Sequence, residues 1–264
     1  MIDQSGQALL KLTQVSRLFG GLQALDNVSL VVPGNRVVGL IGPNGAGKTT
    51  LINTISGLDH PTSGSIQFNG HDIHNQPPHR ITDLGIARTF QNIRLFGDMT
   101  ALENLLISQH GSGRATILDT LVFTPRYRAE ERRLNEKAQR LLERFKLTAV
   151  AHLPAANLPY GDQRRLEIAR ALAANPRLLL LDEPTAGMNP VETEQLGEQI
   201  IQLQNEGFTI LVIEHDMALI HQICDEVYVL NFGQIIAHGT PGEIKQNPLV
   251  IEAYLGHEDE NGEG

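Results

Sequence analysis

A glycine-rich segment in the first fifth of the chain has the residue types and spacing of a phosphate-binding loop. It follows an apolar run at 37–41 and precedes a helical pattern at 50–56, which is the context that such a loop requires. Glycines let backbone N–H groups turn inward around phosphate oxygens, and the helix N-terminus adds its positive dipole end. We expect Lys48 to reach the outer phosphates and Thr49 to hold Mg²⁺. The predicted loop consists of Gly42, Pro43, Asn44, Gly45, Ala46, Gly47, Lys48, Thr49 and Thr50.

Two adjacent carboxylates at the end of a second apolar run supply the other half of the same chemistry. Asp182 and Glu183 follow four leucines at 178–181, which predict a buried strand. At the exposed end of such a strand, Asp182 can hold Mg²⁺ through water, and Glu183 can orient and deprotonate the attacking water. Together with the loop, these residues predict hydrolysis of a nucleoside triphosphate.

The segment shortly before this strand narrows the prediction. Residues 158–166 read LPYGDQRRL and stand before an apolar helix. Here the chain resembles the ATP-binding cassette (ABC) family, whose signature motif, commonly Leu-Ser-Gly-Gly-Gln, occupies this place. The resemblance covers almost the whole chain. It implies that ATP is contacted by the signature residues Leu158, Tyr160, Gly161, Asp162 and Gln163.

Three further positions match the family in their order along the chain. The resemblance implies that Phe19 stacks on adenine, that Gln91 binds the metal and links its site to a membrane partner, and that His215 is the catalytic switch. Each residue alone would be read as structural, and their order and spacing favour the functional interpretation. The implied catalytic set is Lys48, Gln91, Glu183 and His215, and the implied metal ligands are Thr49, Gln91 and Asp182.

The family's mechanism implies that one copy of the chain cannot complete a site. Two cassettes face each other head to tail, so that ATP lies between one phosphate loop and the opposite signature. A second ABC ATPase subunit is therefore an expected partner, in a heterodimer or, as the alternative, a homodimer. Two transmembrane permease subunits and, indirectly, a substrate-binding protein complete the expected assembly. Its cofactors are ATP and Mg²⁺, and no nucleic acid is expected.

Two departures from the common family pattern affect the predicted site. We assign Pro159 to the position that serine usually holds, and Asn189 stands where aspartate is usual. Proline offers neither a hydroxyl nor a backbone N–H. Our hypothesis is that the composite site containing this signature is the weaker of two in an asymmetric dimer.

Other strings resemble the ATPase subunits of bacterial importers for branched-chain and related neutral amino acids. They are RTFQNIRLF at 88–96, YGDQRR at 160–165, AGMNP at 186–190, IEHDM at 213–217 and AYLG at 253–256. The alternatives are an importer of urea or short amides, a non-transport ABC ATPase, a small-molecule kinase and a nucleotide-sensing scaffold. A kinase would leave the signature and His215 unexplained, and the intact Lys48 and Glu183 argue against a scaffold without hydrolysis.

Composition restricts the remaining classes. The 264 residues include 30 acids and 21 bases, for a net charge of −9, which argues against a broad basic face for nucleic acid or anionic lipid. The single cysteine, Cys224, excludes an intrachain disulfide and fits a reducing compartment. No apolar stretch approaches the ~18 residues of a membrane span. We therefore expect a chain that is neither secreted nor membrane-spanning by itself, and the resemblance to importer ATPases implies a peripheral protein on the cytoplasmic face of the membrane.

Alternating strand and helix patterns must position these residues. Strands are predicted at 9–15, 28–32, 37–41, around Asn69–Gly70, and at 86–90, 178–181 and 209–213, with helices after Gly161, from Pro190 and after Asp216. The expected fold class is α/β, a P-loop NTPase of the ABC type with a RecA-like, mainly parallel sheet, an N-terminal antiparallel β piece and an inserted α-helical subdomain. The expected divisions are 1–91 and 161–256 for the core, 92–160 for the insertion, and a mobile acidic tail at 257–264. An apolar stretch at 117–123 could dock a permease, although internal packing is the commoner role.

Overall fold

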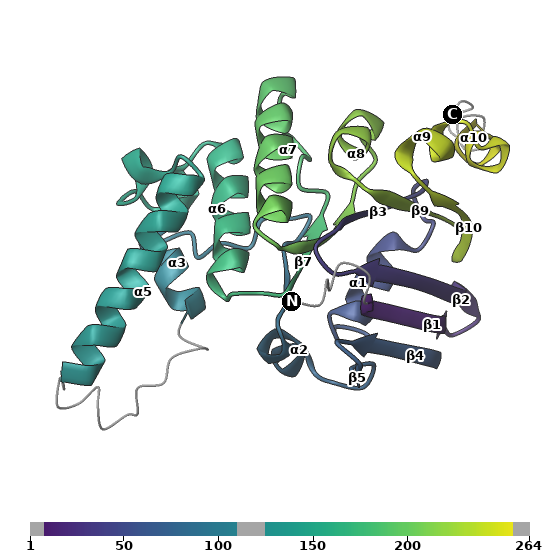
Figure 1. Ribbon diagram of the computed structural model, residues 1–264, viewed down its shortest axis with the longest axis horizontal. Coiled ribbons are helices and arrows are strands. Elements are labelled where there is room, and N and C mark those ends of the chain that lie inside the picture. The colour runs from purple at the N-terminus through teal and green to yellow at the C-terminus, as the bar shows by residue number, and fades with distance from the viewer. Residues whose placement is uncertain (1–7, 110–124, 256–264) are drawn as a thin grey trace. The chain divides into compact units, whose positions relative to one another are not determined.

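The computed structural model describes residues 8–109 and 125–255. The apolar stretch at 117–123 and the acidic tail lie outside the described residues. The chain divides into two compact units after Arg88 and after Pro176. The first and last parts of the chain form one unit, and residues 89–176 form the other (Figure 1). None of the described helices is long and apolar enough to cross a membrane.

A six-stranded sheet is the centre of the first unit. Its order is β10-β9-β3-β8-β7-β6, and all neighbours are parallel except the antiparallel pair β9 and β10. Every residue of β3, β7 and β8 is buried, as expected for parallel strands covered on both faces. The strands are β3 (Val37–Ile41), β6 (Ile86–Arg88), β7 (Leu178–Asp182), β8 (Thr209–Ile213), β9 (Glu226–Asn231) and β10 (Gln234–Gly239).

A second, antiparallel sheet has the order β2-β1-β4-β5. Its strands are β1 (Ala8–Phe19), β2 (Leu22–Pro33), β4 (Ser63–Phe68) and β5 (His71–Asp72). Asn69 and Gly70, both with positive φ, form the turn between β4 and β5, as the sequence predicts. Strands β1 and β2 each extend to 12 residues, well beyond the predicted segments, because they continue to pair up to the turn at Gly20.

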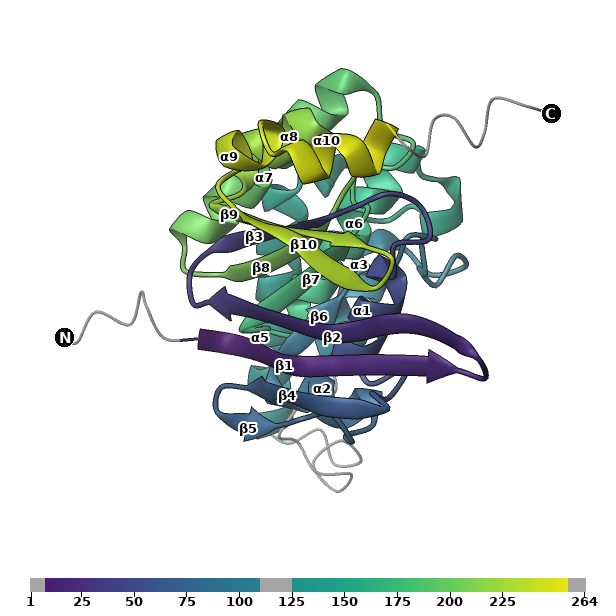
Figure 2. The same cartoon turned by 90° about the vertical axis from the view of Figure 1, so that its right-hand side faces the viewer.

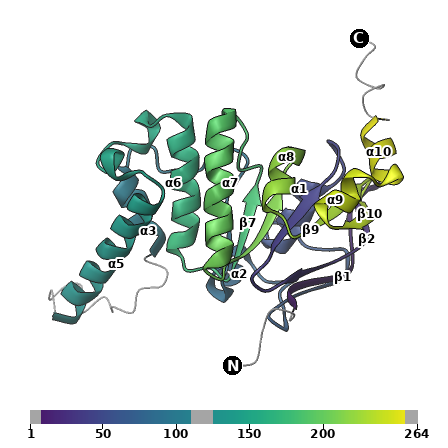
Figure 3. The same cartoon turned by 45° about the horizontal axis from the view of Figure 1, so that its top comes forward.

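Six helices complete the described part of this unit. They are α1 (Lys48–Ile55), α2 (Pro78–Leu84), α7 (Pro190–Asn205), α8 (Met217–Ile223), α9 (Pro241–Lys245) and α10 (Pro248–Leu255). Helices α7 to α10 lie on the face of the six-stranded sheet opposite the antiparallel sheet (Figures 2 and 3). The core between the two sheets includes Leu51, Ile52 and Ile55 of α1, which are completely buried. Each such side chain stabilises the fold by about 1.5–3 kcal/mol relative to an exposed one, so α1 is firmly held where the phosphate loop needs it.

The second unit is helical. Its helices are α3 (Ala101–Gln109), α5 (Pro125–Arg144) and α6 (Tyr160–Ala173), and each packs on the other two. The predicted helical spacing at Leu105, Ala138, Leu142 and Phe145 corresponds to buried positions. The sequence-based division assigns residues 161–173 to the core, whereas in the structure α6 belongs to this unit because it packs on α3 and α5.

Candidate nucleotide site

The predicted phosphate loop joins β3 to α1 and has the backbone of an anion cradle. Gly42, Gly45 and Gly47 have φ of +151°, +77° and +105°. A Cβ at Gly42 would lie 2.0 Å from the carbonyl oxygen of Leu230, so only glycine fits there. Helix α1 begins after Gly47 with no side-chain cap and no acid in its first turn, which leaves its N-terminal N–H groups suited to an anionic ligand.

Lys48 lies folded back onto this loop. Its side chain is buried, and its Nζ donates to the carbonyl oxygens of Gly42 at 2.5 Å and Pro43 at 2.9 Å. Burial lowers the pKa of Lys48, and the nearby charges of Glu183 and Asp182 partly oppose that shift. Phosphate oxygens can replace the two carbonyls as acceptors and restore a strong counter-charge for the ammonium group.

The turn between β9 and β10 braces the same loop, a contact that sequence analysis missed. The Gly233 N–H donates to the carbonyl of Ala46 at 2.9 Å, and the Gly233 carbonyl accepts from the Asp26 N–H at 2.8 Å. The loop is thereby connected to β2 as well as to its own strand and helix. The signal in the sequence is Gly233 itself, because a turn often requires the positive φ that glycine adopts easily. In the structure its φ is +77°.

The two predicted carboxylates lie where β7 ends. Asp182 is buried, and its Oδ2 accepts from Arg88 at 2.9 Å. Glu183 has a left-handed backbone, with φ of +46°, and its N–H donates to the carbonyl of Ile213 on β8 at 2.9 Å. The exposed Thr49 hydroxyl and the Asp182 carboxylate are hard oxygen donors of the kind that Mg²⁺ prefers, so these residues fit a magnesium ion.

Glu214 is a second residue that sequence analysis missed. It is completely buried, and its Oε1 accepts from the Thr185 hydroxyl at 2.5 Å and from the Thr185 N–H at 3.0 Å. Its Oε2 accepts from the N–H of His215 at 3.1 Å. One carboxylate therefore connects the segment after β7 to the segment after β8, and it fixes the backbone of His215, whose side chain is 66% exposed.

Phe19 lies at the end of β1 and is 45% exposed. The Arg17 guanidinium carbon lies 4.4 Å from the centre of the Phe19 ring, and the same side chain forms a 2.7 Å ion pair with Asp59. Because Asp59 holds the Arg17 guanidinium against the ring, the attraction between cation and ring limits the motion of Phe19. The ring is partly exposed, and its stacking on adenine stays a prediction.

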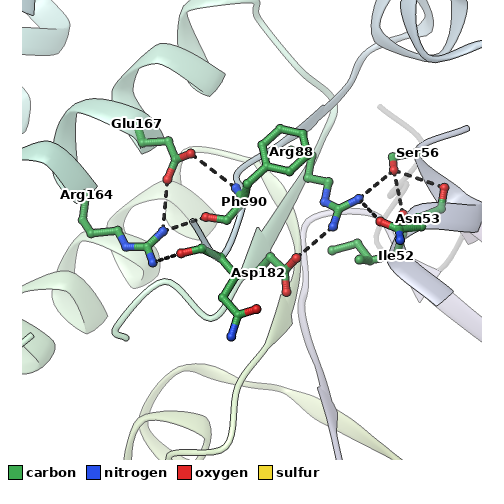
Figure 4. Close-up of polar contacts among 9 residues, drawn as sticks. Ile52, Asn53, Ser56, Arg88, Phe90, Arg164, Glu167 and Asp182 are labelled. Atoms are coloured by element: carbon green, nitrogen blue, oxygen red, sulfur yellow. Dashed lines mark hydrogen bonds and ion pairs between the residues drawn. The ribbon is translucent and has the colours of Figure 1, made fainter. Parts of the chain in front are cut away.

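The helical unit contains Gln91 and the signature, and buried charges connect them. Arg164 of α6 donates to the carbonyl oxygens of Phe90, at 2.7 Å, and Gln91. Glu167, one turn along α6, accepts from the N–H group of Phe90 at 3.4 Å (Figure 4). It also accepts from the N–H group of Arg94 at 3.3 Å. The backbone around Gln91 is thus fixed by the signature helix, while the Gln91 side chain is exposed.

Comparison with known proteins identifies the family. The ABC transporter family model matches residues 25–186. The chain belongs to this family. A second model, described as a branched-chain amino acid ATP-binding cassette transporter, matches residues 234–260 of this ABC protein. It is an ATP-binding, ATP-hydrolysing member with the cassette fold.

Relatives and solved structures agree over nearly the whole chain. BraF of Pseudomonas aeruginosa, a high-affinity branched-chain amino acid transport ATP-binding protein, is 48% identical across 94% of this chain and 98% of its own length. LivG of Escherichia coli K12, which has the same description, is 46% identical across 95% of this chain and 98% of its own length. The solved structure of a nucleotide-free cassette from an ABC transporter is 36% identical, with a TM-score of 0.82. The match covers 94% of this chain and 99% of that structure's chain.

The start of α6 corrects one assignment within the signature of this ABC protein. Counted back from Gln163, the five-residue family pattern covers residues 159–163, so Tyr160 rather than Pro159 stands at the serine position, and Asp162 replaces a glycine. Pro159 instead precedes the helix as its N-cap. Leu158 is buried, and its carbonyl accepts from the Gln163 side chain at 2.8 Å. In this count the signature departs from the family pattern at three positions, Pro159 in place of leucine, Tyr160 in place of serine and Asp162 in place of glycine.

Asn189 has a structural explanation in this ABC protein. Its side chain accepts from the N–H groups of Val191 and Glu192, both at 3.0 Å, and Glu192 accepts from the Asn189 N–H at 3.0 Å. This capping box starts α7. Because asparagine and aspartate are about equally good caps, replacing the usual aspartate leaves the helix start intact.

Proposed function

We propose that this ABC ATPase is the energy-coupling subunit of an importer for branched-chain or other neutral amino acids. The observation that carries the proposal is the agreement of its relatives, which are named as ATP-binding proteins of branched-chain amino acid transport at 46–48% identity. The second family model, on residues 234–260, supports the same substrate class. The strings noted in the sequence point to the same substrate class.

The geometry within the first unit supports a role in hydrolysis for the site residues that lie in that unit. Lys48 transfers its hydrogen bonds from the loop carbonyls to the outer phosphates, and Phe19 stacks on the base. Thr49 and Asp182 would hold Mg²⁺, which would neutralise phosphate charge, and Gln91 keeps the metal-binding role that the family resemblance implies. Glu183 accepts the proton of the attacking water, and His215, fixed through Glu214, donates to the γ-phosphate. The reaction gives ADP and phosphate.

The proposed assembly contains a second cassette, two permease subunits and, indirectly, a substrate-binding protein, with this chain on the cytoplasmic face of the membrane. A solved bacterial ABC transporter cassette, 26% identical with a TM-score of 0.76, is described as dimeric. We propose a dimer here too, most simply with a different cassette subunit and alternatively with a second copy. In that dimer the start of α6 would approach the ATP of the other subunit.

The proposal is tested by uptake of labelled amino acids and urea in cells that carry either the wild-type chain or Glu183→Gln. Loss of the general base lowers turnover by about 10²–10⁴-fold, so uptake of leucine, isoleucine and valine is expected to cease while ATP stays bound. Glu198→Gln, the same change on an exposed residue of α7, is the matched control and should transport normally.

Other outcomes contradict the proposal in distinct ways. Loss of urea uptake alone would favour an importer of urea or short amides. Unchanged uptake of every compound, together with lost ATPase activity, would indicate a non-transport ABC ATPase. Normal turnover in Glu183→Gln would remove Glu183 from the role of general base.

A further inference from the structure

A buried cation lies beside the carboxylate to which we assign the metal. Arg88 is the last residue of β6, and its side chain is only 7% exposed. One terminal nitrogen donates to Oδ2 of Asp182 at 2.9 Å, and the Asp182 side chain is 6% exposed (Figure 4). Removing two charges from water costs several kcal/mol per ion, so a pair this deeply buried needs further stabilisation.

That stabilisation comes from the end of α1. The other terminal nitrogen of Arg88 donates to Oδ1 of Asn53 at 2.7 Å and to Oγ of Ser56 at 3.0 Å. The Ser56 hydroxyl donates to the carbonyl of Ile52 at 2.8 Å, so its oxygen is left to accept from the guanidinium. Helix α1 has no basic residue in its own last turn, and Arg88 supplies the cation that a helix C-terminus favours.

Arg88 therefore connects both halves of the proposed magnesium site. Its two terminal nitrogens contact Asp182 and the C-terminal end of α1, the helix that begins with Lys48 and Thr49. The planar guanidinium fixes directions as well as distances, so it restricts rotation of the Asp182 carboxylate. Partners that orient a metal-binding carboxylate in this way commonly affect metal affinity by 10–100-fold.

We propose that Arg88 is a positioning residue for Mg²⁺ binding, which holds the Asp182 carboxylate in register with α1. The inference rests on the proposed magnesium role of Asp182 and adds a residue that neither the motifs nor the family resemblance assigns. Arg88 does not touch ATP in this role. It acts on the metal through Asp182, so ATP binding without metal should not require it.

The test measures binding rather than turnover. A fluorescent N-methylanthraniloyl ATP analogue is titrated onto the purified chain in EDTA, and Mg²⁺ is then titrated into the complex. Arg88→Met is expected to weaken the apparent Mg²⁺ affinity by about 10–100-fold and to change the affinity measured in EDTA by less than about threefold. Arg88→Lys, which keeps the charge but loses the planar fork, should give an intermediate Mg²⁺ affinity.

Two controls make the result decisive. Arg36 forms a 2.8 Å ion pair with Asp225, and the Arg36 side chain is 48% exposed. Arg36→Met removes this ion pair and should leave the Mg²⁺ titration unchanged. If Arg88→Met does not fold, the double variant Asn53→Ala with Ser56→Ala retains the ion pair but removes its support, and a several-fold loss of Mg²⁺ affinity is expected.

The outcomes separate this inference from the function on which it rests. If Asp182→Asn weakens Mg²⁺ affinity but Arg88→Met, or its substitute double variant, does not, Arg88 has only a structural role and the inference is wrong. If Asp182→Asn itself leaves Mg²⁺ affinity unchanged, the magnesium assignment fails first. An equal loss of ATP affinity with and without Mg²⁺ would also overturn the positioning role.

Discussion

The backbone at Glu183 is strained at a residue to which we assign the role of general base. Its φ of +46° lies in the left-handed region, which non-glycine residues rarely adopt. Such a conformation costs about 1–3 kcal/mol. The hydrogen bond from its N–H to Ile213 and the pairing of β7 with β8 hold it in place. The backbone that carries the carboxylate is thus held at the edge of the sheet.

Cys224 gives a prediction about alkaline stability. Burial, with a smaller effect from the charge of Asp225, raises the pKa of its thiol well above the ordinary value. The folded state therefore favours the neutral thiol, and the unfolded thiol ionises first, near pH 8.5. This stabilisation is present below pH 8.5 and is lost as the pH rises, by up to about 1.4 kcal/mol per pH unit.

Urea unfolding between pH 7.5 and 10.5 measures this effect. The free energy of unfolding of the wild type should fall more steeply than that of Cys224→Ala, since other titrating groups are common to both proteins. Parallel pH profiles for the two proteins would show that the thiol is as easily ionised in the folded state as in the unfolded state.

At the scale of elements, α6 does more than present the signature. The side chains of Arg164 and Glu167 are both 2% exposed, and Nη1 of Arg164 lies 3.2 Å from Oε2 of Glu167. Together they hold the backbone of residues 90–94 through four hydrogen bonds. The helix and the segment that carries Gln91 therefore form one rigid piece within the helical unit. A change at the signature would reach Gln91 through these side chains.

Breaking this pair has a predictable cost. Glu167→Ala removes the carboxylate and leaves the Arg164 guanidinium buried without its ion-pair partner. We therefore expect the free energy of unfolding to fall by roughly 3–5 kcal/mol. Amide hydrogen exchange at residues 90–94 should accelerate because the N–H groups of Phe90 and Arg94 lose the carboxylate that accepts their hydrogen bonds. The double variant Arg164→Met with Glu167→Leu should be less destabilised than Glu167→Ala. Equal destabilisation of the two would mean that the buried charge is not the cause.

At the scale of the whole molecule, the signature has a role only in the proposed dimer. Asp162 lies in the first turn of α6 and pairs with Arg165. A carboxylate at this position opposes the binding of a phosphate by the helix N-terminus. This is the physical basis for expecting the site with this signature to be the weaker of two.

Restoring the family pattern tests that asymmetry. Tyr160→Ser combined with Asp162→Gly should raise the ATPase rate of the assembled transporter several-fold, and Asp162→Asn should act in the same direction because it removes only the charge. Asp162→Glu serves as the control and should have little effect. Unchanged rates in all variants would show that the signature does not limit turnover.

The sequence by itself determined the elements with strong local patterns. The bounds of β3 and β8 were predicted to the residue, because buried parallel strands are continuous apolar runs. The start of α7 followed from its cap, and the phosphate loop followed from its glycines. Strands β9 and β10 were both missed. Strand β10 pairs on one side only and its mixed exposure carries no period, whereas β9 has a buried apolar run at 227–230 that was present as a signal in the sequence.

Only the tertiary structure decided which charged residues support the site. Arg88 meets Asp182 across 94 positions of sequence, Glu214 meets Thr185 across 29, and Arg164 meets Phe90 across 74. Such pairs leave no periodic signal, because each depends on a separate strand or helix bringing its side chain to the partner. Motifs therefore identify the groups that would touch the nucleotide, and folding selects the buried charges that hold those groups in position.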